Sequence, residues 1–205
     1  MYTPLDYRNT NLSEVKEFMR QNSFGILVNQ TEGRPWATHI PLELDVDTDG
    51  SDLLVGHVSK ANPQWKYFRE QEEVLAIFNG PHSYISSSWY KEEEVPTWNY
   101  IAVHVYGTIE ILNEEALLRS LHKLVDKYET VASQPVSIHD LSEKTMQQIN
   151  GIVGFQIRIS EVQATYKLSQ TRPEDHPQII SELNKNKNSG SKEIAQMMKN
   201  NICPR

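Results

Sequence analysis

The chain has 205 residues, 38% of them hydrophobic, a formal net charge of −7 and a single cysteine, Cys203. The acidic balance disfavours a protein that grips DNA phosphates through a basic face. One cysteine excludes an internal disulfide and a CxxC metal or redox motif. Neither a secretory signal nor the ~18 uninterrupted apolar residues of a membrane span is visible, so we expect a cytoplasmic protein without membrane contact.

The first half of the chain predicts one helix followed by short strands. Asn11 can cap a helix, with Glu14 three residues later in a capping-box arrangement. Asn62 and Pro63 form a second helix start. Strands are expected over residues 24–30, 35–44, 53–59, 73–80 and 83–90, the fourth ending at Gly80-Pro81.

The next strand, within VPTWNYIAVHVYGTIEI (residues 95–111), has two unlike faces. Successive strand side chains point to opposite sides, so the even positions Trp98, Tyr100, His104 and Tyr106 form an aromatic face and the odd positions an aliphatic one. The aliphatic face belongs in a core. The aromatic face needs a cover, because each exposed large ring forgoes ~1.5–3 kcal/mol of burial. A second subunit or the chain's own predicted helix over residues 113–130 would supply it.

The second half of the chain continues with helices and one long strand. An amphipathic helix begins at Asn113, and a weaker helical pattern covers residues 141–149. The last strand, residues 151–170, changes its apolar parity near Ser160, which predicts a bulge or bend there. About seven strands with peripheral helices indicate a mainly β, barrel-like domain. From residue 173 the composition becomes polar, so we expect a barrel domain over 1–172 and a partly mobile helical appendage over 173–205.

Familiar catalytic motifs are missing from the sequence. It contains no GxSxG, Walker loop, GxGxxG after a strand, or HExxH. The seven histidines include three on predicted strands, His39, His57 and His104, but no carboxylate accompanies them at a tight ligand spacing. We therefore expect no metal site. All four tryptophans lie between residues 36 and 98, which suits either a core or interface cluster or a wall for a flat aromatic ligand.

Six segments together resemble the PaiB family, FMN-binding proteins described as negative transcriptional regulators of sporulation and degradative-enzyme synthesis. The segments are PWATHIPLELD, GHVSKANPQW, FNGPHSYISSSWY, VPTWNYIAVHVYG, GIVGFQI and YKLSQTR. The resemblance implies an FMN-binding split β-barrel of about six or seven antiparallel strands, as in pyridoxamine-phosphate-oxidase-like flavoproteins. It also implies a homodimer with FMN where the subunits meet. Ser87 and Thr171 depart from the proline and asparagine usual in the family.

The implied cofactor suggests roles for particular residues. A flavin phosphate needs cations, hydroxyls or amide donors, and the isoalloxazine ring needs donors at its edge. The candidate phosphate-binding residues are Lys60, Lys167, Arg172, Thr38, Ser86 and Asn62, and the candidates for the ring are His39, Asn99, Gln170 and, along its margin, Trp98. Lys60 and Arg172 also suit solvated surface positions. Lys167 lies within a strand whose other residues follow the expected apolar alternation, so its ammonium group needs a partner.

Three functions remain open at the level of sequence. The family resemblance favours a flavin-binding repressor, and the missing basic recognition helix makes indirect regulation more consistent with the chain than direct DNA binding. The fold implied by the resemblance also suits an FMN-dependent oxidoreductase, with His39 or His104 as an acid or base. In the third reading, the aromatic face is only a dimer contact without flavin. Which residues act in catalysis is not indicated.

Overall fold

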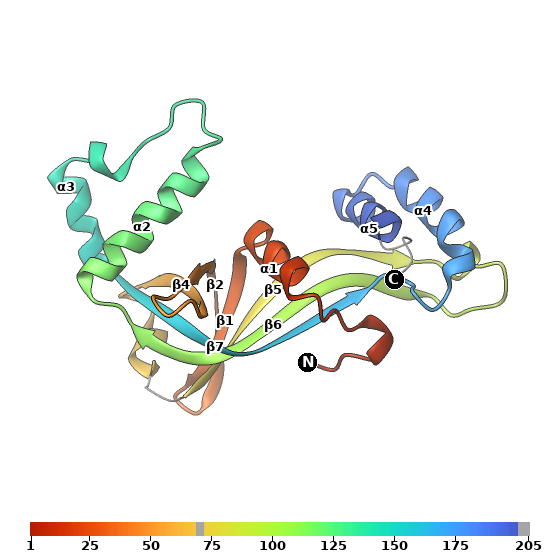
Figure 1. Ribbon diagram of the computed structural model, residues 1–205, viewed down its shortest axis with the longest axis horizontal. Coiled ribbons are helices and arrows are strands. Elements are labelled where there is room, and N and C mark those ends of the chain that lie inside the picture. The colour runs from red at the N-terminus through yellow and green to blue at the C-terminus, as the bar shows by residue number, and fades with distance from the viewer. Residues whose placement is uncertain (69–71, 201–205) are drawn as a thin grey trace. The chain divides into compact units, whose positions relative to one another are not determined.

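The computed structural model describes residues 1–68 and 72–200 and, within them, seven strands and five α-helices. The strands are β1 (Phe24–Thr31), β2 (Arg34–Pro41), β3 (Glu43–Val46), β4 (Asp52–Ser59), β5 (Glu73–Ile85), β6 (Thr97–Ile111) and β7 (Ile152–Lys167). They form one antiparallel sheet in the order β2-β1-β5-β6-β7-β4-β3 (Figure 1). The predicted mainly β fold of about six or seven antiparallel strands is confirmed. In the described chain, no ladder joins the edge strands β2 and β3, so the sheet is not closed.

The helices lie largely where the periodicity predicts them. They are α1 (Leu12–Gln21), α2 (Glu114–Glu129), α3 (Glu143–Met146), α4 (His176–Lys185) and α5 (Ser189–Asn200). Asn11 Oδ1 accepts the Glu14 amide at 3.3 Å, and Asn113 Oδ1 accepts the Ala116 amide at 2.9 Å, as expected of N-caps. The predicted helix at Pro63 is a short 3-10 helix, η2 (Pro63–Tyr67). Cys203 lies outside the described residues.

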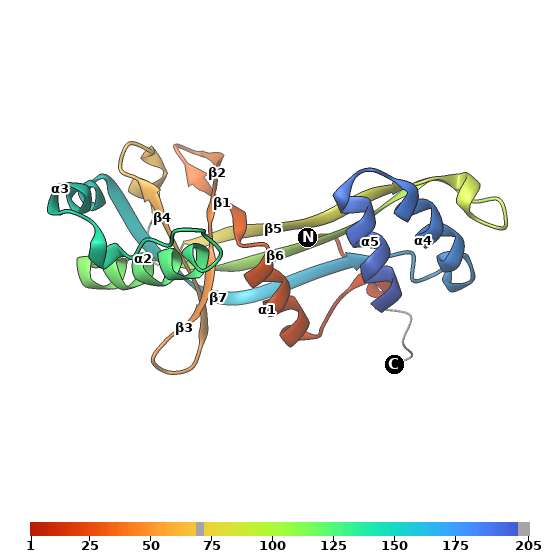
Figure 2. The ribbon, with the colours of Figure 1, turned by 90° about the horizontal axis from the view of Figure 1, so that it is seen from above.

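The chain divides into two compact units, described separately below. Unit 1 comprises Met1–Glu17, Phe78–His104 and Gln163–Arg205, and unit 2 comprises Phe18–Ile77 and Val105–Val162. The long strands β5, β6 and β7 contribute residues to both. In unit 1, the helices α4 and α5 pack on each other (Figure 2). The predicted boundary at residue 172 stays a prediction.

Unit 2 contains the β1–β2 hairpin and the β3–β4 hairpin. Residues Glu32 and Gly33 connect β1 to β2 with φ values of 52° and 77°, the left-handed pair that a tight hairpin turn requires. β4 pairs with β7 from Leu53↔Arg158 to Ser59↔Ile152. α2 covers β7 at Gly154, where an added Cβ would lie 2.7 Å from Leu117 Cδ1. This helix therefore packs directly on the sheet.

Unit 1 has its own core, beneath α4 and α5. Its fully buried side chains include Ile85, Val103, Leu168, Ile179, Leu183, Ile194 and Met198. A buried hydroxyl pair, Ser83 Oγ and Ser191 Oγ at 2.9 Å, links β5 to α5. The C-terminal helices thus pack on the ends of the strands in this unit.

Three strand predictions are corrected by the structure. β5 runs from Glu73 to Ile85 without a break at Pro81, and residues 87–89 form a 3-10 helix instead of a further strand. Pro81 lies beyond the β1 ladder, which covers only Leu75 to Ile77, so the N–H that proline lacks is not required by β1. The predicted strand over 35–44 is divided at Leu42, whose amide donates to the Ser23 carbonyl at 2.8 Å.

The two patterned strands have the faces that were predicted. In β6 the odd positions from Asn99 to Ile109 are buried and the even ones are half-buried, apart from Trp98, which is 53% exposed. In β7 the buried apolar side chains lie at the odd positions Val153, Phe155 and Ile157 before Ser160 and at the even positions Ala164 and Tyr166 after it, although Thr165 is buried as well. This agrees with the predicted change of apolar parity, and the bulge or bend expected near Ser160 stays a prediction.

Candidate functional site

A buried polar network joins the β1–β2 hairpin to η2 in unit 2. Its centre is Gln64, which is fully buried. The Gln64 side-chain amide donates to the Leu27 carbonyl at 3.2 Å and to Asn29 Oδ1 at 3.0 Å. Its carbonyl oxygen accepts the Thr38 hydroxyl at 2.5 Å. Because a buried amide without partners is costly, this network fixes η2 against the hairpin.

Asn62 connects this network to the surface. Its Oδ1 caps η2 by accepting the Gln64 amide at 3.1 Å, and its Nδ2 donates to Thr38 Oγ1 at 2.9 Å. The Thr38 hydroxyl donates its single proton to Gln64, so it has none left for a ligand. Asn62 Nδ2 carries a second hydrogen that no described residue accepts. Thr38 therefore positions Asn62, and Asn62 is the group that can donate outward.

Lys60 precedes this cap and has an exposed, unpaired side chain. Its backbone is held at both ends, since its amide donates to the Gly151 carbonyl at 2.8 Å and its carbonyl accepts Trp65 Nε1 at 3.0 Å. No described carboxylate pairs with its ammonium group. His39 lies on β2 next to Thr38, and its side chain is exposed. Lys60 and Asn62 thus place a cation and an amide donor two residues apart on a fixed backbone.

Donors outnumber acceptors in this network. Asn29 Oδ1 accepts from both Gln64 and Thr31, whereas Asn29 Nδ2 is buried and has no acceptor among the described residues. Asn29 Nδ2 is out of reach of a ligand, but the second Asn62 Nδ2 hydrogen and the unpaired Lys60 ammonium, two residues apart in the chain, suit an anion. The residues of unit 2 therefore fit the phosphate group of a flavin mononucleotide. Sequence reasoning missed Gln64 and Asn29, although the ANPQW segment that contains Gln64 was singled out.

The remaining predicted site residues belong to unit 1, and several are used by the fold itself. Gln170 accepts the Leu168 amide at 2.7 Å and donates to the Tyr166 carbonyl, so its amide is spent on the turn after β7. Asn99 is fully buried and bonded to Ser169. Ser86 Oγ accepts the Ser88 amide at 3.3 Å as an N-cap. These three side chains stabilise local structure.

Trp98, Lys167 and Arg172 are the more accessible members of the unit 1 group. Trp98 packs against Tyr84 and His82, with ring centroids 5.9 and 6.0 Å apart. Arg172 forms an ion pair with Glu94. Lys167 Nζ donates to Thr97 Oγ1 at 2.5 Å, and burial lowers the pKa of this lysine. The structure thus brings Lys167 and Arg172 to the lining of one cavity, of about 230 Å³, while Trp98 lies in an aromatic cluster with Tyr84 and His82.

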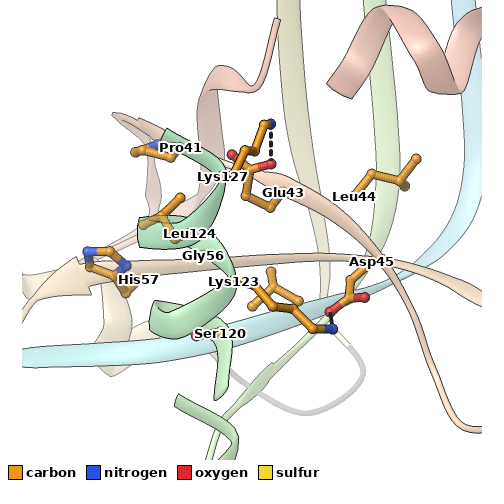
Figure 3. Close-up of a pocket in the computed structure, with 11 residues that line it drawn as sticks. Pro41, Glu43, Leu44, Asp45, Gly56, His57, Ser120, Lys123, Leu124 and Lys127 are labelled. Atoms are coloured by element: carbon orange, nitrogen blue, oxygen red, sulfur yellow. Dashed lines mark hydrogen bonds and ion pairs between the residues drawn. The ribbon is translucent and has the colours of Figure 1, made fainter. Parts of the chain in front are cut away.

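A second cavity, of about 160 Å³, lies between α2 and strands β2, β3 and β4 of unit 2 (Figure 3). Two ion pairs border it, Lys123 with Asp45 at 2.5 Å and Lys127 with Glu43 at 2.6 Å. Its one titratable side chain without a described hydrogen-bond partner is His57, and burial lowers the pKa of that imidazole. Because each lysine already has a carboxylate, the cavity offers no free cation for a phosphate.

Metal and membrane sites are not found in the described chain. Within residues 1–68 and 72–200, no three His, Cys, Asp or Glu side chains are grouped so that they could hold a metal ion. Among the helices of that same part, none is both long and apolar enough to span a bilayer.

Comparison with known proteins identifies the family to which the chain belongs. Residues 1–161 match the family described as "Putative FMN-binding domain". The chain is 42% identical over 204 residues to the protease synthase and sporulation protein PAI 2 of Bacillus subtilis strain 168, covering 98% of each protein.

Two solved structures share the fold at low sequence identity. The FAD and heme binding protein of Mycobacterium smegmatis has a TM-score of 0.62 at 14% identity, covering 78% of this chain and 73% of that one. The flavocytochrome Anf3 of Azotobacter vinelandii has a TM-score of 0.57 at 17% identity, covering 78% and 69%. Both support the split-barrel architecture. The sequence match across nearly the whole chain goes further, and this protein belongs to the PaiB family of FMN-binding proteins.

Proposed function

We propose that the chain binds FMN with its phosphate at Lys60 and Asn62, and that it acts as a negative regulator of gene expression. The observation that carries the proposal is the Gln64-centred network, which holds an unpaired lysine and a free amide donor on one fixed backbone. This network lies inside residues 1–161, the part that matches the FMN-binding family. Bound FMN would supply reversible electron transfer, and the protein groups named here would bind and orient it.

Lys60 gives the sharpest test of the phosphate site. We expect Lys60→Met to weaken FMN binding about tenfold or more, because one charge-assisted hydrogen bond to the phosphate is lost. The matched control is Lys66→Met, an exposed lysine on η2 outside the network. Flavin fluorescence quenching measures both. Equal affinities in the two variants would place the phosphate elsewhere.

A homodimer is the second part of the proposal. Trp98 and Tyr84 are 53% and 46% exposed, and they stack with His82 into one aromatic cluster on unit 1. Rings that pack on one another while remaining this exposed are typical of protein interfaces. We propose that a second copy of the chain covers this cluster. In the proposed assembly, it also covers the half-buried even face of β6.

Regulation through a partner fits the charge better than direct DNA binding. The formal net charge is −7, whereas direct binding to phosphates needs a basic face. The Bacillus subtilis relative is named for protease synthesis and sporulation, which supports a regulatory role for this chain. We therefore expect no sequence-specific DNA retention at physiological salt by the purified protein.

Two measurements separate this proposal from its alternatives. A purified protein that is yellow and releases FMN on denaturation would exclude a flavin-free dimer, and reduction by NADH or NADPH distinguishes the regulator from an FMN-dependent oxidoreductase. Bleaching of the bound flavin by NADH or NADPH at a catalytic rate would favour the enzyme. Slow bleaching in a protein that still represses its targets in cells would favour the regulator.

A further inference from the structure

Unit 1 contains a cavity of about 230 Å³ that is separate from the proposed phosphate site. It lies among the N-terminal segment, the chain leading into β6 and the turn after β7, and its walls include Tyr7, Tyr90, Val95, Thr97 and Lys167. All of its lining residues belong to this one unit. At this volume it is smaller than the roughly 300 Å³ at which pockets for drug-sized ligands begin. FMN is too large for it, and a small metabolite is not.

Lys167 is the charged group that this cavity leaves unneutralised. Its ammonium donates to Thr97 Oγ1 at 2.5 Å and lies 5.5 Å from the centre of the Tyr7 ring. Among the described residues, no carboxylate forms an ion pair with it. An ammonium group has three donors, so two remain for a ligand. The lowered pKa of Lys167 has burial as its cause, as expected for a partly desolvated cation without a counter-charge.

The second cation at this cavity is already paired. Arg172 forms an ion pair with Glu94, and this contact and the Val95 amide hold the pKa of the Glu94 carboxyl below its ordinary value, the amide most strongly. The Glu94 charge would repel a dianion that approached the rim. One free ammonium beside a neutralised pair therefore suits a ligand with one negative charge.

The turn beneath Lys167 is held in a strained conformation. Ser169 has a φ of 60°, which a non-glycine residue rarely adopts, and it is buried. Asn99 Nδ2 donates to Ser169 Oγ at 2.9 Å, and His176 Nε2 contacts the Ser169 carbonyl at 2.8 Å. Strain of this kind persists where surrounding contacts over-determine it, and it is concentrated at functional sites. The floor of the cavity is thus rigid before any ligand arrives.

We propose that this cavity binds a small organic monoanion, a carboxylate on an apolar or aromatic body. The carboxylate would accept hydrogen bonds from the Lys167 ammonium, and Tyr7, Tyr90 and Val95 would contact the body. The site is independent of the flavin phosphate site in unit 2. This step rests on the regulatory function proposed above: binding of such a ligand would give the regulator an input separate from flavin binding.

The proposal is tested with benzoate, and with benzamide as its neutral counterpart. Isothermal titration into the full-length, FMN-loaded protein should detect benzoate and not benzamide. Lys167→Met should weaken benzoate binding at least about tenfold while FMN affinity stays unchanged. The control Lys192→Met, at an exposed lysine on α5, should leave both affinities unchanged.

Three results would overturn the proposal: equal binding of benzoate and benzamide, unchanged benzoate binding in Lys167→Met, or displacement of benzoate by added FMN. The last would make the cavity part of the flavin site. Because the variant removes a partly desolvated charge, it should melt at or above the wild-type temperature. If it fails to fold, Thr97→Val, which removes the hydroxyl that orients Lys167, should weaken benzoate binding measurably, and an unchanged affinity would equally contradict the proposal.

Discussion

Gln64 and Gln170 illustrate how side chains that suit ligand binding by type can be used by the fold. Gln170 was expected at the flavin, yet its amide bonds the backbone of its own turn. Gln64 was not expected at the site, yet it holds Thr38, Asn29 and the start of η2 together. The residue type reveals the donors and acceptors available, and only the tertiary partners decide whether any remain free for a ligand.

Substituting Gln64 should therefore affect stability strongly. We expect Gln64→Ala to lower the free energy of unfolding by about 3 kcal/mol, because Thr38 and Asn29 lose their buried partner together with a packed side chain. Urea denaturation measures the change. Gln178→Ala, at an exposed position of α4, is the control. If both variants were equally stable, the network would not be fixing η2.

His57 should make stability depend on pH in the mildly acidic range. Burial lowers its folded-state pKa below the unfolded value of 6.5, so the unfolded state takes up a proton first as the pH falls. The stability linked to His57 is complete above pH 6.5 and is lost as the pH falls through the folded-state pKa. His57→Gln should therefore lose less stability than wild type between pH 7.5 and about 5.5. Melting temperatures of wild type and His57→Gln, measured across this pH range, test the prediction. The same pH dependence in both proteins would contradict it.

At the scale of elements, periodicity predicted the faces of β6 and β7 because alternation is a property of neighbouring residues. It placed a strand end at Pro81, where β5 in fact continues to Ile85. Whether proline ends a strand depends on which edge needs an N–H, and this is set by the partner strand. For η2, the cap at Asn62 was predicted correctly, but the sequence did not predict that the helix would be a short 3-10 helix.

At Gly107, the backbone of β7 lies close against β6. A Cβ at this position would lie 2.2 Å from the Arg158 carbonyl oxygen, a backbone atom that cannot turn aside. Gly107→Ala should therefore lower the free energy of unfolding by about 3 kcal/mol. Gly151→Ala is the matched control, since nothing lies within 4 Å of its added Cβ, and it should change stability by less than about 0.5 kcal/mol. Comparable losses in both variants would contradict this account.

For the whole molecule, the proposed homodimer can be tested at its aromatic cluster. Trp98→Ser should raise the dimer dissociation constant at least about tenfold, since a buried tryptophan commonly dominates interface energy. Tyr2→Ser, which removes an aromatic ring that is 88% exposed and outside the cluster, should leave assembly unchanged. Sedimentation equilibrium over a range of concentrations measures both. A wild-type protein that stays monomeric throughout would exclude the dimer and require another cover for the cluster.

The sequence by itself determined the mainly β class, the strand faces, the helix caps and the family, because these depend on local patterns and short motifs. Only the tertiary structure decided that Thr38, Asn62 and Gln64 form one network, that Arg172 is neutralised by Glu94, and that Lys167 is left unpaired. These contacts join residues that are 24 to 78 positions apart. Local periodicity carries no information about such pairs, since they are set by which strands and loops the fold brings together.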